Sequence, residues 1–145
     1  MQSGGTLTHE ANTTAQNYEI DFSAASINIQ SGGSINVDGK GYTGGAAGGN
    51  NGNGTGGGTG SAANGAGAGG HSGDGGAGLI VSGGAGYCDV SSPATIGSGG
   101  GGSASFDGGS GGGLIILNAP SGAVTINGTI SGVGLDVPLG HAGGG

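Results

Sequence analysis

The chain has 145 residues, of which 45 are glycine, 3% are aromatic and 6% are charged, and its net charge is −7. Near one-third glycine is typical of collagen, but collagen also needs a strict Gly-X-Y frame and abundant proline, and this chain has 3 prolines. Lys40 is the one Lys or Arg residue, which argues strongly against nucleic-acid binding and disfavours anionic membrane surfaces. The low hydrophobicity predicts no membrane insertion.

The first part of the chain predicts short strands after a polar segment. Residues 1–16 show no periodicity, so we expect a leader or an edge segment there. We expect one glycine-rich domain over residues 17–145, as part of a longer chain that contains repeats. Residues 18–22 alternate apolar and acidic side chains, which predicts a half-buried strand. Residues 26–29 and 34–37 repeat the alternation.

Two arrangements fit the eight-residue spacing between these last two segments. Successive rungs of a β-solenoid would stack Ile27 on Ile35. The same stacking would place Ile29 on Val37. A hairpin with a three-residue loop over 31–33 would instead pair Ile29 with Ile35 and Ile27 with Val37.

Glycine dominates residues 44–113 in three runs, Gly44–Gly60, Gly65–Gly78 and Gly97–Gly113. Because glycine loses much backbone freedom on folding, a flexible linker is one reading of these runs. The other reading is polyglycine II, which has three residues per turn and whose neighbouring chains bond to one another. A run of about 15 residues would then span roughly 45 Å. The three-residue spacing that favours this reading is that of Gly67, Gly70, Gly73 and Gly76.

Strand signals return after the glycine runs. Leu114–Leu117 is continuously apolar, as in a strand covered on both faces. Val124 and Ile126 alternate with polar residues, and Gly122–Gly128 shares one template with Gly33–Gly39. Thr129–Ser131 and Leu135–Val137 are candidates for further short strands. The strand residues expected to carry the structure are Ile35, Val37, Leu117, Val124 and Ile126.

No segment has a helical 3.6-residue period. We therefore expect an all-β fold without α-helix, in which short solenoid- or sandwich-like strands combine with a bundle of polyglycine II helices.

Several pieces occur in a characteristic order: residues 33–45, a glycine tract with Gly-Gly-His71, residues 87–102, Gly-Gly-Gly-Leu-Ile-Ile-Leu117 and residues 124–131. Over residues 26–134 the chain thus resembles the glycine-rich repeat modules of very large secreted or surface proteins in bacteria. It is more distantly similar to the glycine-rich extracellular region of the anaplastic lymphoma kinase receptor. The resemblance implies an extracellular structural or adhesive module and brings no catalytic residues. Cys88 and an Asn-rich first run depart from it.

Four aspartates in or near the glycine-rich region are the candidates for a metal site, here calcium, which prefers oxygen ligands. The nearest match to a calcium-binding nonapeptide, around Gly69–Asp74, lacks the glycine that Ser72 replaces. The alternative is turn chemistry, in which each carboxylate bonds its own loop. The four are Asp38, Asp74, Asp89 and Asp107.

The remaining candidates are single residues. His9, His71 and His141 lack partners at zinc spacing, and we expect them to be exposed or bonded to backbone. Cys88 has no partner for an internal disulfide, so it is a half-buried side chain or forms an intermolecular bridge. N-glycosylation sequons begin at Asn12, Asn53 and Asn127.

No motif supports catalysis, and we expect neither an enzyme nor a cofactor. The expected function is a structural module of an extracellular filament, sheath or surface adhesin, which self-associates with identical subunits through main-chain hydrogen bonds. An ice-binding or carbohydrate-binding module is the alternative. The expected location is extracellular or at the cell surface.

Overall fold

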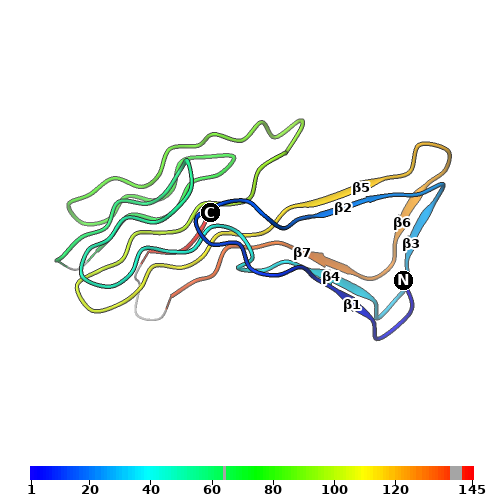
Figure 1. The fold of residues 1–145 in the computed structure, drawn as a ribbon, viewed down its shortest axis with the longest axis horizontal. Coiled ribbons are helices and arrows are strands. Elements are labelled where there is room, and N and C mark those ends of the chain that lie inside the picture. The colour runs from blue at the N-terminus through cyan, green and yellow to red at the C-terminus, as the bar shows by residue number, and fades with distance from the viewer. Residues whose placement is uncertain (64, 138–141) are drawn as a thin grey trace.

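The computed structural model describes residues 1–63, 65–137 and 142–145. It has two parts, strands gathered at one end and the glycine-rich segments at the other (Figure 1). The described residues contain short strands and no helix, which confirms the all-β expectation. The strands are β1 (Thr6–Leu7), β2 (Ile20–Ser23), β3 (Ile27–Ile29), β4 (Ser34–Asn36), β5 (Ile115–Asn118), β6 (Val124–Ile126) and β7 (Thr129–Ser131).

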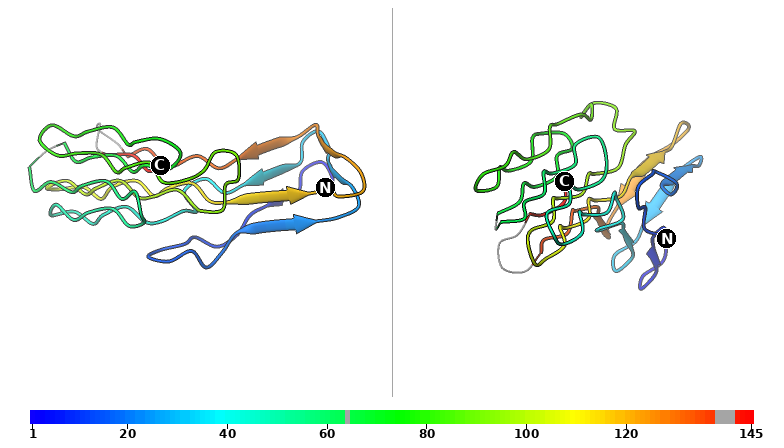
Figure 2. Two further views of the ribbon diagram at one scale, coloured as in Figure 1. Left: turned by 90° about the horizontal axis from the view of Figure 1, so that it is seen from above. Right: turned by 60° about the vertical axis from the view of Figure 1, so that its left-hand side comes forward.

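The strands form two similar turns of chain that lie on each other. In each turn the chain runs away from the glycine-rich part, crosses over and returns, first through β2, β3 and β4 and then through β5, β6 and β7 (Figures 1 and 2). All pairs are parallel: β2 with β5, β3 with β6, and β4 with β7 on one side and β1 on the other. Residues 39–113 form the glycine-rich part between the two turns.

The register differs from both arrangements expected for β3 and β4. Ile27 lies beside Val124 and Ile35 beside Ile130, so β3 and β4 do not pair with each other. They form consecutive sides of one turn. The corner between them bends through Gly32, whose φ is 81°, and through a hydrogen bond from Gly33 N to Gln30 O. The two segments that share the glycine template, β4 and β6, do not pair with each other, because β4 pairs with β7.

A small aliphatic core lies between the strands. Ile20, Ile29, Ile35 and Val37 are buried together, and Ile115 and Leu117 pack against them. The predicted strand after the glycine runs is therefore correct, but Ile115 to Leu117 are only half-buried. Ile35 and Val37 are confirmed as core residues, and Leu117 contributes from the second turn.

The glycine runs fold back on themselves, so the expected straight run of about 15 residues is wrong. The chain bends at 47–49 and 53–56 in the first run, at 71–73 in the second and at 104–106 in the third. In the second run, Ala68 N donates to Gly76 O across the bend. His71 fixes this bend, since its Nε2 lies 2.9 Å from Thr95 O and its ring meets Tyr87 edge-on at 5.5 Å.

The bend also shifts the phase of the close glycine contacts. A Cβ atom at Gly67 would lie 2.0 Å from Ser82 O, and one at Gly70 would lie 2.6 Å from Ala85 O. Gly73 and Gly76 have no atom within 4 Å of such a Cβ, so the close contacts at three-residue spacing do not continue through the bend. After the bend the close contacts fall on Gly75 and Gly78 instead.

Residues 96–103 are all buried, and their hydrogen bonds follow a three-residue cycle. The amides of 97 and 100 donate to segment 109–112, those of 98 and 101 to segment 67–70, and those of 99 and 102 to segment 50–53. Carbonyl groups of the same residues accept amides from segments 42–48 and 58–61 and from Gly145. One extended segment is thus bonded to neighbours on several sides.

The glycine positions of this segment have no room for a side chain, because the backbones of neighbouring segments are so near. A Cβ at Gly101 would lie 2.3 Å from Thr59 O, and one at Gly102 would lie 2.1 Å from Ala46 O. These distances are far below van der Waals contact, so even alanine would push a neighbouring segment away.

Candidate assembly surface

The second turn of strands has an open edge along β5, β6 and β7. Each of these strands pairs with a first-turn strand on one side and with no described residue on the other. On either side of β6, Ala123 O accepts from Ile27 N and Asn127 N donates to Ile29 O. Because backbone groups alternate in direction along a strand, those of Val124 and Ile126 point to the open edge. Unpaired edges of this kind are templates for another strand.

Apolar side chains accompany this edge. Val124, Ile126 and Ile130 are 39%, 49% and 37% exposed, although they lie in register beside buried residues of the first turn. Val124 and Ile126 are thus strand residues, as expected, but they lie outside the buried core. The first-turn residues are covered by the second turn, whereas no described strand covers the second turn.

The opposite end of the same sheet is also open. In the sheet β1-β4-β7, β1 pairs with β4 through bonds such as Ser34 N to Gly5 O, and its other side pairs with no described residue. Leu7 on β1 is 41% exposed. This sheet therefore ends on two parallel edges, each with an exposed aliphatic residue, Leu7 at one and Ile130 at the other.

No family model, curated protein or solved structure matches the chain significantly. The geometry of the residues themselves therefore carries the functional argument.

Each of the four aspartates accepts hydrogen bonds from the protein, within its own turn for Asp89 and from segments more distant in sequence for Asp38, Asp74 and Asp107. Asp74 Oδ1 accepts from Gly86 N, Asp89 Oδ1 from Ser91 N and Asp107 Oδ1 from Ala47 N, all at 2.7 or 2.8 Å. The hydrogen bonds of Ser91 lower the pKa of Asp89. Within the described ranges, no three His, Cys, Asp or Glu residues are grouped as metal ligands.

Asp38 is the one aspartate that joins the two turns of strands. Its carboxylate accepts from Ser131 Oγ, at the end of β7 in the second turn, and from Val133 N, two residues further on. The hydrogen bond from Ser131, then that from Val133, lowers the pKa of Asp38. This role connects residues far apart in sequence, and no local pattern indicates it.

A second group of hydrogen bonds, around Tyr87, joins residues 87–96 to the glycine segments. The Tyr87 hydroxyl donates to Ile96 O and accepts from Ser98 Oγ at 3.0 Å. Burial raises the pKa of Tyr87. The His71 ring contacts the Tyr87 ring, and its Nε2 bonds to the backbone. His9 is also bonded to the backbone, as expected, since its Nδ1 lies 2.7 Å from Glu10 O. His141 lies outside the described residues.

The three sequons have different environments. Asn12 is only 1% exposed, and its side-chain amide donates to Tyr18 O and Lys40 O, both at 2.8 Å. Its Oδ1 accepts the amides of Asn17 and Tyr18. Asn12 is therefore a buried structural residue that cannot carry a glycan in this fold. The sequon pattern gives no sign of this burial. Asn53 is half-buried and bonded to Thr43, whereas Asn127 is exposed.

Cys88 is half-buried and unpaired among the described residues, and its Sγ lies 3.6 Å from Asp89 O. The parts of the chain that the structure describes include no helix of the length and apolarity that crossing a membrane requires.

Proposed function

We propose that the protein is a rigid structural module of an extracellular filament, sheath or surface adhesin, and that copies join through main-chain hydrogen bonds. The observation that carries the proposal is the pair of open parallel edges, β1 and β7, at opposite ends of one sheet. A contact between different surfaces of identical copies is head-to-tail, so it grows into a filament when the rotation between copies does not close a ring.

The junction that fits best places β7 of one copy beside β1 of the next. The internal pairing of β4 with β7 is the pattern for this contact, since it is parallel and sets Ile35 beside Ile130. Stacking of this kind would cover Val124, Ile126 and Ile130, which now face solvent. The strands would then form a continuous β-solenoid across copies.

Stiffness would come from the glycine-rich part, in which we propose polyglycine II helices. The three-residue cycle of hydrogen bonds along residues 97–102 supports this, because polyglycine II has three residues per turn. Each backbone group would be satisfied by a neighbouring segment, so that rigidity does not need large side chains. Such a material suits a load-bearing role better than a catalytic pocket, and we assign no enzymatic activity.

Electron microscopy and sedimentation of the purified protein over a range of concentrations test this proposal. Wild type should form linear polymers, and Ile126→Lys should abolish them because it places a charge in the junction. Ile80→Lys is the matched control, since Ile80 is 71% exposed and belongs to none of the strands. Polymers should persist in high salt because hydrogen bonds, not surface charges, join the copies.

Polymers that form equally well with Ile126→Lys, or that dissolve in modest salt, would contradict the proposed junction. A wild-type protein that stays monomeric at every concentration would contradict the function itself.

A further inference from the structure

The first turn of strands is left uncovered beside β2. On the side away from the second turn, residues 1–7 cover β3 and β4. At β3, the Met1 amino group donates to Asn28 O, and Gln30 N donates to Met1 O at 3.1 Å. At β4, the covering strand is β1. Among the described residues, β2 pairs only with β5. The edge of β2 that faces away from β5 therefore has room for one more strand.

The main chain of β2 presents hydrogen-bonding groups along this edge. Ile20 N donates to Leu114 O and Ala24 N to Asn118 O, both at 3.0 Å, so these even-numbered residues face β5. Because the direction alternates along a strand, the N–H and C=O groups of Asp21 and Ser23 face the opposite, open side.

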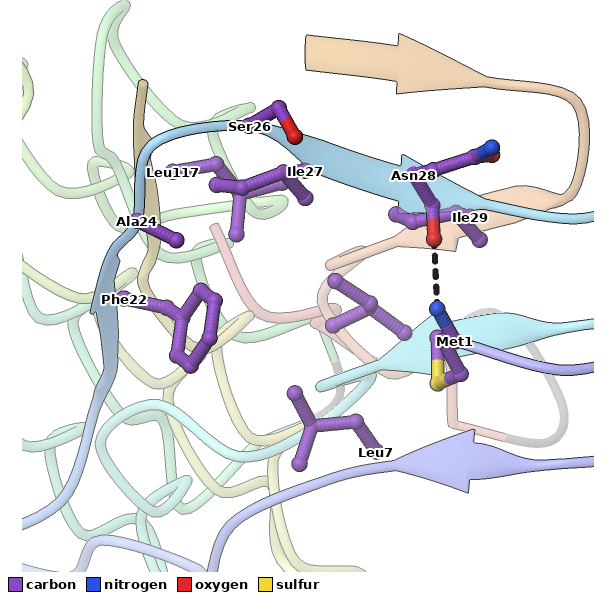
Figure 3. A pocket seen from close by; sticks show the side chains of 10 residues that line it. Met1, Leu7, Phe22, Ala24, Ser26, Ile27, Asn28, Ile29 and Leu117 are labelled. Atoms are coloured by element: carbon purple, nitrogen blue, oxygen red, sulfur yellow. Dashed lines mark hydrogen bonds between the residues drawn. The ribbon is translucent and has the colours of Figure 1, made fainter. Parts of the chain in front are cut away.

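An apolar cavity of about 400 Å³ lies next to the same edge. Figure 3 shows Met1 and β1 near one side of the cavity and Phe22 on the other, with Ile27 and Ile29 behind. Phe22 is 50% exposed although it lies in register beside Leu117, because no described strand covers it from the open side. A strand added to β2 would direct alternate side chains into this cavity.

The outer face of the edge is acidic. Glu19 and Asp21 are both exposed and point away from the cavity side of the strand, as the alternation with Ile20 and Phe22 requires. The chain has a net charge of −7 and one Lys or Arg, so a second copy offers little to balance these carboxylates. A basic segment does, since opposite charges on neighbouring strands attract.

We infer that β2 is a docking edge for an extended peptide segment of a partner protein, with aliphatic residues at alternate positions and lysine or arginine between them. The segment adds as a strand through the backbone groups of Asp21 and Ser23. Its aliphatic side chains enter the cavity beside Phe22, and its basic side chains face Glu19 and Asp21. This inference goes beyond the proposed assembly, which uses β1 and the second turn.

Fluorescence anisotropy with a labelled peptide tests the inference. The probe is acetyl-Thr-Lys-Ile-Lys-Leu-Lys-Thr-amide, and the control is the same composition with isoleucine and leucine adjacent, which breaks the alternation. The probe should bind saturably and at least tenfold more tightly than the control. A probe N-methylated at the bonding amides should not bind.

Ser23→Pro is the informative variant of the protein. It removes an N–H that faces the open side while the bonds from β2 to β5 remain, and proline is tolerated at strand edges in this orientation. Probe affinity should fall at least tenfold, with Ser23→Ala unchanged and circular dichroism like that of wild type. Asp21→Asn keeps the fold in any case and should weaken binding severalfold, with a smaller salt dependence.

The inference is overturned if the two peptides bind equally, or if no binding is seen at millimolar probe. It is also overturned if binding by folded Ser23→Pro and by Asp21→Asn matches wild type. Dimers that Ser23→Pro dissolves, without peptide binding, would mean that β2 pairs with a second copy instead. All these results are independent of whether filaments form.

Discussion

The Asp38 carboxylate accepts a hydrogen bond of 2.5 Å from Ser131 Oγ, which joins the end of the first turn of strands to the second. The Val133 amide donates to the same oxygen at 2.9 Å, and Asn36 Nδ2 donates to the other at 3.1 Å. One side chain thus holds together two segments, one that precedes the glycine-rich part in the sequence and one that follows it.

Asp38→Ala should lower the free energy of unfolding by about 1–2 kcal/mol near pH 6, because hydrogen bonds to a charged acceptor are lost. The pKa of Asp38 is lowered from 3.8 in the folded protein. Its contribution is therefore fully present above the unfolded value and disappears as pH falls through the folded value. Urea unfolding from pH 6 downward should show wild type and variant converging in acid. A constant difference down to the lowest pH would contradict this role.

A pair of glycine substitutions tests the close packing of the backbones. Gly101→Ala should destabilise the protein by more than about 2 kcal/mol, since the new methyl group would meet Thr59 O. Gly76→Ala is the matched control in a glycine segment with open space around the added atom. It should be neutral or stabilise by about 0.4–1 kcal/mol, because alanine restricts the unfolded chain. Thermal unfolding of both measures the difference, and equal midpoints would count against the packing described.

Asn12→Ala should cost roughly 2–4 kcal/mol, because it removes the buried side-chain amide that donates to Tyr18 O and Lys40 O and accepts from the Asn17 and Tyr18 amides. The exposed Asn127→Ala should change stability by less than about 0.5 kcal/mol. Chemical denaturation compares the two. A small effect at Asn12 would mean that water replaces its hydrogen bonds.

Glycan mapping after expression in a glycosylating host tests the same environments. Folded, secreted protein should carry a glycan at Asn127 and none at Asn12. Folded protein modified at Asn12 would contradict the buried position of that side chain.

The alternation of side chains predicted most of the strands but not their partners. Residues 18–22, 26–29 and 34–37 each contain or overlap a strand, as do Leu114–Leu117 and Thr129–Ser131. The pairing of Ile27 with Val124 could not be predicted, because it depends on where the glycine-rich part returns the chain. The exposure of Val124 could not be predicted either, since alternation indicates which side chains share a face and not whether another segment covers that face.

In the glycine region, the spacing of glycines predicted only part of the hydrogen-bonding pattern. The three-residue period is present in the hydrogen bonds of residues 97–102, but the series from Gly67 to Gly76 crosses the bend at His71 and loses its phase. The buried Ser98 and Ser103 were missed, because serine among glycines gives no sign of burial. Ser98 is explained only in three dimensions, by its hydrogen bonds with Tyr87 and Gly56 N.

Amide hydrogen exchange, resolved by residue, tests most directly whether these side-chain-poor segments are rigid. The amides of residues 97–102 should exchange at least about a thousandfold more slowly than in an unstructured peptide, while those of the exposed bend at 72–74 exchange much faster. Exchange across 97–102 at the rate of the bend would contradict the account, since it would mean that the glycine segments are not held by one another.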